Sequence, residues 1–145
     1  MKPFLAVLVP VLMLAACGSR DVVPAMDSTG PALVVERFLQ AANTNDLHAM
    51  TQLFGTSRGT IDQLEPRERA EKRMQVLASV LRHDDYTIQG QRAVPGRLQD
   101  ATDMLVELQI GDRKVVVPHL VVRRRDGWII ERIEIEALTL HGVER

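Results

Sequence analysis

Apolar residues recur at helical spacing between residues 31 and 82. Three stretches carry an apolar residue every three or four positions, with polar and charged residues on the remaining faces. The pattern predicts helices over residues 31–42, 47–54 and 66–82, and a loop over 55–65. Pro31 and Pro66 stand where two of these helices begin, because a first-turn residue needs no N–H partner inside the helix. The apolar stripes are Val34, Val35, Phe38, Ala41 and Ala42, then Leu47, Met50, Leu53 and Phe54, then Ala70, Met74, Leu77 and Leu81.

The period changes to two from Tyr86 onward, which is the spacing of half-buried strands. We expect strands over residues 86–91, 104–110, 114–124 and 128–138. Pro118 indicates an edge position or a bulge within the third of them. Asp126-Gly127 is a hairpin signal before the last. Helices followed by a meander predict an α+β domain, with two short helices and a longer one packed on a bent, mostly antiparallel four-stranded sheet.

The expected last strand has its apolar residues in two opposite phases. Trp128 and Ile130 share one parity, whereas Ile133 and Ile135 share the other. In a straight strand the two sets would point to opposite faces of the sheet. One extra residue near Glu131-Arg132 would return both sets to one face, which predicts a β-bulge there. The alternative is a strand covered on both faces, as at a dimer interface.

The beginning of the chain has the composition of an export signal. Lys2 is followed by an uncharged, mostly apolar run from Phe4 to Ala16, of signal-peptide length and too short to span a bilayer. The end of this run, Leu14-Ala15-Ala16-Cys17, resembles the lipobox of bacterial lipoproteins. That resemblance implies cleavage before Cys17 and attachment of a diacylglyceryl group to its sulfur. Two or more acyl chains hold a protein stably at a membrane.

The lipobox implies a division of the chain into three parts. Residues 1–16 are the signal peptide, residues 17–30 are the lipidated cysteine and a tether, and residues 31–145 are one domain. The resemblance implies a location in the cell envelope, at the outer membrane facing the periplasm if the host is Gram-negative. Gly18, directly after the cysteine, is permissive for that export.

Composition narrows the classes of function. Cys17 is the single cysteine, so the chain offers neither an internal disulfide nor a thiolate cluster for a metal. The 18 Lys and Arg residues nearly balance the 19 Asp and Glu residues, which argues against a nucleic-acid partner. His48, His83 and His141 lack metal-ligand spacing, and no glycine-rich phosphate loop is present in the sequence. We therefore expect no cofactor and no metal.

Segments of the domain resemble the NTF2-like (cystatin-like cone) superfamily, and in particular its small bacterial lipoproteins. The resemblance lies in residues 34–42 with Asp46-Leu47, in 103–108 and in 126–130. It spans roughly residues 31–138 and implies a bent sheet that wraps the long helix and leaves a conical pocket. It implies no particular chemistry, because the superfamily contains enzymes, binding proteins and assembly modules.

Three polar residues on the expected strands are the candidates for such a pocket: Tyr86, His119 and Glu131. A strand tyrosine is commonly a core residue with its hydroxyl at the rim. His119 shares parity with Val117 and Val121, and a lone histidine in that setting is commonly structural. Glu131 either points inward, where it needs an arginine partner or a raised pKa, or faces solvent if the bulge turns it outward.

A run of basic residues, Arg123-Arg124-Arg125, precedes the last turn. Beside a membrane anchor it could meet anionic head groups. The neighbouring acidic residues Asp126, Glu131, Glu134 and Glu136 favour a solvated hairpin end instead.

Two functions from different classes follow. The first is a non-catalytic, membrane-anchored domain that binds a small apolar ligand or a protein partner, including a second copy of the chain. The alternative is a small envelope enzyme of isomerase or dehydratase type that acts in the cone. Two or more convergent groups with shifted pKa values would favour the enzyme, and a filled or all-apolar cone would favour binding.

Overall fold

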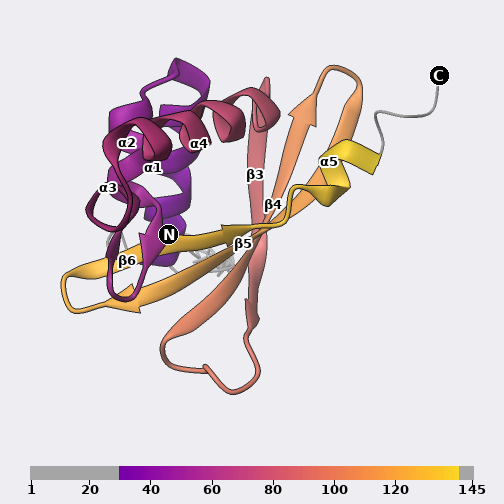
Figure 1. The fold of residues 1–145 in the computed structure, drawn as a ribbon. Helices are drawn as coiled ribbons and strands as arrows, with labels where there is room; N and C mark the ends of the chain where they lie inside the picture. The colour runs from indigo at the N-terminus through magenta and orange to yellow at the C-terminus, as the bar shows by residue number, and fades with distance from the viewer. Residues whose placement is uncertain (1–29, 141–145) are drawn as a thin grey trace, which may run out of the picture.

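The computed structural model describes residues 30–140. The expected signal peptide, Cys17 and the tether up to residue 29 lie outside the described residues, as do residues 141–145. The described chain is an α+β domain with one four-stranded antiparallel sheet, ordered β3-β4-β5-β6, and one two-stranded sheet, β1-β2 (Figure 1). The elements are α1 (Pro31–Thr44), α2 (Leu47–Leu53), β1 (Gly55–Thr56), β2 (Gly59–Thr60), α3 (Ile61–Leu64), α4 (Arg67–Val80), β3 (Asp85–Ala93), β4 (Ala101–Ile110), β5 (Arg113–Arg124), β6 (Gly127–Ile133) and α5 (Glu136–Leu140).

The three predicted helices are present as α1, α2 and α4. Helix α1 was expected over residues 31–42, as one of two short helices. It has 14 residues instead, as many as α4. It ends where Asn45 adopts a left-handed backbone with φ 54°. The carboxylate of Asp46 then caps α2 by accepting from the N–H of Ala49 at 3.0 Å. No helix of the described chain is long and apolar enough to cross a membrane.

Helix α1 is the element that joins the other layers. It contacts β4, β5 and β6 on one side and α2 and α4 on the other. Its residues Val35, Phe38 and Leu39 are fully buried in the core. Figure 1 shows α1 to α4 gathered on one side of a strongly twisted sheet, in which β6 runs across the direction of β3, while α5 lies apart from the other helices. Large twist of this kind follows from the right-handed twist of each strand, increased where bulges occur.

The predicted bulge in the last strand is confirmed. Leu120 pairs with Arg132 and Val121 pairs with Ile130, so Glu131 is an extra residue without a partner across the ladder. The shift brings Ile130 and Ile133 to the helix-facing side of the sheet, where both belong to the main core. The arrangement therefore satisfies the two phases of apolar residues within one domain. A second bulge, at Gln89 in β3, was not predicted.

Two predictions about irregular segments were wrong. The segment 55–65 is not a plain loop but contains the β1–β2 hairpin and α3, with the N–H of Thr60 donating to Oε1 of Gln63 at 3.2 Å. The last strand ends at Ile133 rather than at residue 138, and α5 follows. The N–H of Glu134 still donates to the carbonyl of Pro118 in β5, at 3.0 Å, and the chain then enters α5 at Glu136.

Pro118 lies in β5, an inner strand of the sheet, just beyond the part of β5 that pairs with β6. It pairs with Leu105 of β4, but the ladder between β5 and β6 reaches only from Arg124 to His119. From Pro118 toward the start of β5, the strand therefore has a ladder partner on one side only. A missing N–H disrupts no sheet hydrogen bond at such a position.

The space between the sheet and the helices is filled by side chains. The largest fully buried ones on the helix side of the sheet include Phe38, Leu39, Met50, Met74 and Leu81. A smaller apolar cluster lies on the opposite face of the sheet, where Ala101, Leu120, Val122 and Ile129 pack together with Val94. The described residues thus form one main core between the helices and the sheet and a smaller one on the opposite face.

We expect Gly55→Ala to destabilise the domain. A Cβ at Gly55 would lie 2.3 Å from the carbonyl oxygen of Gly59 and 2.8 Å from Cα of Thr60, both of them backbone atoms of the paired strand. The free energy of unfolding should fall by about 2 kcal/mol. Thermal unfolding should show this as a loss of about 10 °C in Tm.

Gly90→Ala is the matched control for this prediction. Nothing lies within 4 Å of a Cβ at Gly90, and the alanine should leave the domain as stable or slightly more stable, by up to about 1 kcal/mol. Equal Tm values for the two variants would contradict the close approach of β1 and β2.

Candidate functional site

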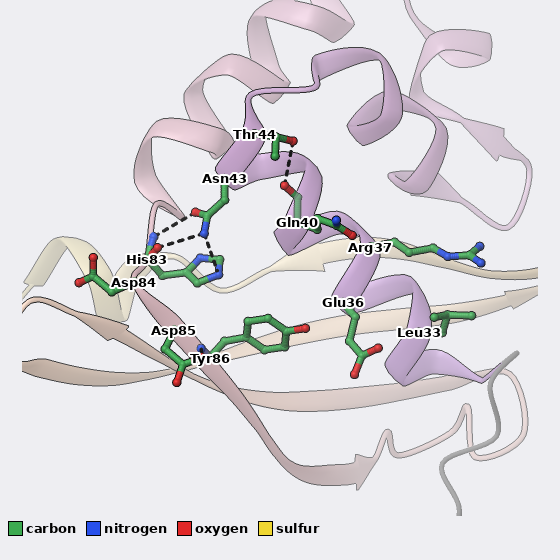
Figure 2. A pocket seen from close by; sticks show the side chains of 10 residues that line it. All are labelled: Leu33, Glu36, Arg37, Gln40, Asn43, Thr44, His83, Asp84, Asp85 and Tyr86. Carbon is green, nitrogen blue, oxygen red and sulfur yellow. Dashed lines mark hydrogen bonds between the residues drawn. The ribbon is translucent and has the colours of Figure 1, made fainter.

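The candidate site is a groove between α1 and the start of β3. It has a volume of about 530 Å³ and is lined mainly by polar and charged side chains (Figure 2). Helix α1 supplies one wall, and the segment from His83 to Tyr86 supplies the other. The lining residues are Leu33, Glu36, Arg37, Gln40, Asn43, Thr44, His83, Asp84, Asp85 and Tyr86.

Asn43 ties the end of α1 to the segment that precedes β3. Its amide nitrogen donates to the carbonyl of His83 at 3.0 Å, and its side-chain oxygen accepts from the N–H of His83 at 3.2 Å. Nδ1 of His83 lies 2.8 Å from the carbonyl oxygen of Leu81, which can only accept, so Nδ1 carries the proton. Nε2 is then an acceptor, and the Asn43 amide lies 3.3 Å from it. The side of the groove nearest the end of α1 is therefore held rigidly.

Tyr86 extends from β3 into the middle of the groove. Its ring packs edge-on against the ring of His83, with centroids 5.6 Å apart and planes at 88°. Figure 2 shows the phenol pointing toward Glu36 on α1. Burial raises the pKa of Tyr86 above its usual 10.0, and the carboxylates of Glu36 and Asp85 raise it further. At neutral pH this side chain is a protonated hydrogen-bond donor.

The two aspartates at the start of β3 support the backbone around them. The carboxylate of Asp84 accepts from the N–H of Gly111, at 2.7 Å, and joins β3 to the turn between β4 and β5. The carboxylate of Asp85 accepts from the N–H of Tyr86 at 2.9 Å. Among the residues that line the groove, these two carboxylates and that of Glu36 outnumber the cation of Arg37.

His119 is in a different place, on the helix-facing side of β5. It is fully buried and pairs across the ladders with Met104 and Ile133. Its Nδ1 donates to the carbonyl of Val117 at 2.9 Å, while Nε2 has no hydrogen-bond partner among the described residues. Burial lowers the pKa of His119 to about 4, so the ring is neutral at neutral pH.

Glu131 is the bulge residue and lies apart from both of the other candidates. Its carboxylate accepts from Arg97 at 3.0 Å, and its side chain is 25% exposed. The hydrogen bond to this carboxylate raises the pKa of the Arg97 guanidinium. Arg97 belongs to the loop between β3 and β4, so the ion pair fastens this loop to the bulge. Glu131 has the arginine partner that a partly buried carboxylate needs.

Of the three residues singled out in the sequence, only Tyr86 lines the groove. Glu36, Asn43 and His83 were not predicted as parts of one site, because they are brought together by a contact between residues 40 positions apart. The helical stripe places Glu36 on the polar face of its helix, but the sequence does not indicate what this face meets. The structure shows that this face meets the segment between α4 and β3, which Asn43 holds in place.

The groove places Tyr86 beside His83 and opposite Glu36. The raised pKa of Tyr86 makes its phenol a poorer acid than a free tyrosine. Within residues 30–140, no three side chains of the metal-binding types gather into a site. What the groove offers chemically is hydrogen bonding and a surplus of negative charge. No protein-family model, no curated protein and no solved structure matches the chain.

We expect Glu36→Gln to lower the pKa of Tyr86. Removing the carboxylate removes one of the charges that disfavour the phenolate, so the titration should move back toward the ordinary value near 10. Tyr86 is the single tyrosine of the chain, and its ultraviolet absorbance can be followed against pH without interference from another phenol. Glu68→Gln, on the first turn of α4, is the matched control and should leave the titration unchanged.

We expect His119 to make the domain sensitive to acid. Its pKa is lower in the folded state than the ordinary 6.5, so the unfolded chain takes up a proton first as pH falls. The contribution is fully present above pH 6.5 and is lost progressively down to about pH 4, with a total of about 3 kcal/mol in the free energy of unfolding.

Urea unfolding at several pH values measures this effect. His119→Leu should show a smaller loss between pH 6.5 and pH 4 than the parent chain, because the buried ring is gone. His48→Gln, at an exposed position on α2, should keep the parental dependence. Identical pH profiles for His119→Leu and the parent would contradict the assignment.

Proposed function

We propose that this chain is a lipid-anchored envelope protein with a non-catalytic NTF2-like domain that binds a polar partner in the groove between α1 and β3. The observation that carries the binding role is the groove itself, whose polar wall is fixed by the Asn43–His83 hydrogen bonds. A preformed concavity with a few oriented polar groups is typical of a binding site.

Support for the anchor comes from the sequence. Leu14-Ala15-Ala16-Cys17 follows an apolar run and contains the chain's only cysteine. The first helix of the described domain begins at Pro31, 14 residues after the proposed lipidation site. This arrangement is consistent with a domain held outside the bilayer by acyl chains, in the cell envelope, and at the outer membrane in a Gram-negative host.

Support for a binding role over an enzyme comes from the positions of the titratable groups. Tyr86 lies in the groove, His119 in the core and Glu131 on the bulge beside Arg97. An isomerase or dehydratase needs an acid and a base within reach of one substrate. In the described part of the chain, the two side chains with the clearest burial effects, Tyr86 and His119, belong to different sites.

The lining of the groove favours a polar partner over a small apolar ligand. Glu36, Asp84 and Asp85 give it negative charge, and Tyr86, Gln40 and Asn43 give it donors and acceptors. A segment of a partner protein that carries a positively charged side chain fits this lining best. The bent sheet and the order of helices and strands are in keeping with an NTF2-like fold.

Native mass spectrometry of the mature chain, released from detergent, tests both halves of the proposal. The expected result is a chain that starts at Cys17 and carries the added mass of acyl groups, together with a non-covalently bound partner. Glu36→Gln combined with Tyr86→Phe should lose the partner and keep the acyl mass. Cys17→Ser should lose the acyl mass.

Three outcomes distinguish the parts of the proposal. A bare acylated monomer from the native host would contradict the binding role and leave the anchor intact. An unmodified Cys17 would contradict the anchor. A dimer that persists in the Glu36→Gln/Tyr86→Phe variant would make a second copy of the chain the partner and would contradict the role of the groove.

A further inference from the structure

The start of the domain lies against the hairpin between β5 and β6. Gly30, the first described residue, lines a groove of about 290 Å³ together with Asp126, Gly127 and Trp128 of this hairpin. Arg37 lines the same groove from α1. The point at which the chain enters the domain, and from which the segment toward Cys17 departs, is therefore next to the run Arg123-Arg124-Arg125.

Three of the four arginines at this end form no ion pair within the described part of the chain. Arg124 pairs with Asp126 at 3.2 Å. Among the described residues, no ion pair involves Arg37, Arg123 or Arg125. All three of these arginines are exposed. The hairpin end thus presents a net positive surface, although the formal charge of the whole chain is −1.

The acidic residues that follow in the sequence do not neutralise this surface. Glu131 is engaged with Arg97, and Glu134 pairs with Arg132 at 3.5 Å while its N–H donates to Pro118. Pro118 is six residues along β5 from Arg124, which is about 20 Å at the rise of a strand. The solvated hairpin end expected from sequence counted on Asp126, Glu131, Glu134 and Glu136. Of these, Asp126 stays at the hairpin and pairs with Arg124, whereas Glu131 and Glu134 pair with other arginines.

Trp128 adds an amphipathic ring to the same surface. It is half-buried, packs partly against the main core and lines the groove beside Gly30. The guanidinium of Arg123 lies over its ring, 6.0 Å from the centroid. Tryptophan with neighbouring basic residues is a combination suited to the region of lipid head groups.

We propose that the hairpin surface, made of Arg37, Arg123, Arg125 and Trp128, rests on the anionic phospholipid head groups of the membrane that holds the acyl anchor. The inference rests on the proposed function, since the anchor supplies the proximity. From Cys17 to Gly30 the chain can extend by at most about 45 Å. The hairpin surface is the part of the domain next to that attachment point, and its charge is complementary to anionic lipid.

Energy transfer from Trp128 to a dansyl-labelled lipid measures this contact directly. Trp128 is the single tryptophan of the chain, so the donor reports on the hairpin surface alone. The mature, acylated chain is placed in vesicles of phosphatidylcholine with or without phosphatidylglycerol. We expect stronger transfer in the vesicles with phosphatidylglycerol, and its reduction by high salt.

Arg123→Gln/Arg125→Gln should abolish the part of the transfer that depends on phosphatidylglycerol. Each arginine near an anionic surface contributes about a fivefold change in the contact equilibrium, so the pair should weaken it by about 25-fold. Arg37→Gln alone should weaken it about fivefold. Arg113→Gln/Lys114→Gln is the matched control, because it removes the same charge from the other end of β5. Circular dichroism confirms that each variant is folded.

The outcomes distinguish this inference from the anchor. Equal transfer with and without phosphatidylglycerol in an acylated chain overturns the hairpin surface and leaves the anchor intact, and so does equal loss in the Arg113→Gln/Lys114→Gln control. If Cys17 proves unmodified, the same chain is mixed with the two kinds of vesicle and floated. Retention that requires phosphatidylglycerol and Arg123 supports the surface, and flotation that requires neither overturns it.

Discussion

The structure depends on one extra residue in β6. Without Glu131 the strand would turn either Ile130 or Ile133 out of the core, because alternate side chains of a strand face opposite ways. With it, both isoleucines belong to the main core, and a bulge of this kind bends the strand and increases its twist. The bulge also sets the direction of Glu131 itself, whose carboxylate then reaches Arg97 and holds the β3–β4 loop. Packing, curvature and loop position thus follow from a single inserted residue.

Much of the fold could be predicted from the sequence, because periodic burial leaves a direct trace in residue order. The three helical stripes, the change of period at Tyr86 and the bulge near Glu131 are of this kind. The hairpin over β1 and β2 could not be predicted, since its strands are two residues each and its close approach depends on Gly55. The early end of β6 was missed for another reason. The apolar residues beyond Ile133 also pack against the core, so their pattern does not reveal that the strand has ended.

The candidate site was predictable only in part. Tyr86 could be singled out, as a lone tyrosine on a strand, but the residues around it belong to α1 and to the connection after α4. Asn43 and His83 are brought together by tertiary packing that no local pattern encodes. His119 shows the opposite case, in which a polar residue with core parity is simply a core residue, buried at the cost of an unpaired Nε2. A titratable residue on a strand therefore indicates chemistry only once its neighbours are known.

Strand β5 has a consequence that reaches beyond packing. Its 12 residues separate the β5–β6 hairpin from the β4–β5 turn by about 40 Å at the rise of an extended strand. The turn is fastened to Asp84, beside the groove, through the N–H of Gly111. If the hairpin end lies at a bilayer, the length of β5 places the Asp84 end of the groove away from the lipid, in the aqueous compartment. A partner could then enter there without displacing lipid, and the length of one strand would set how far from the membrane the two proteins meet.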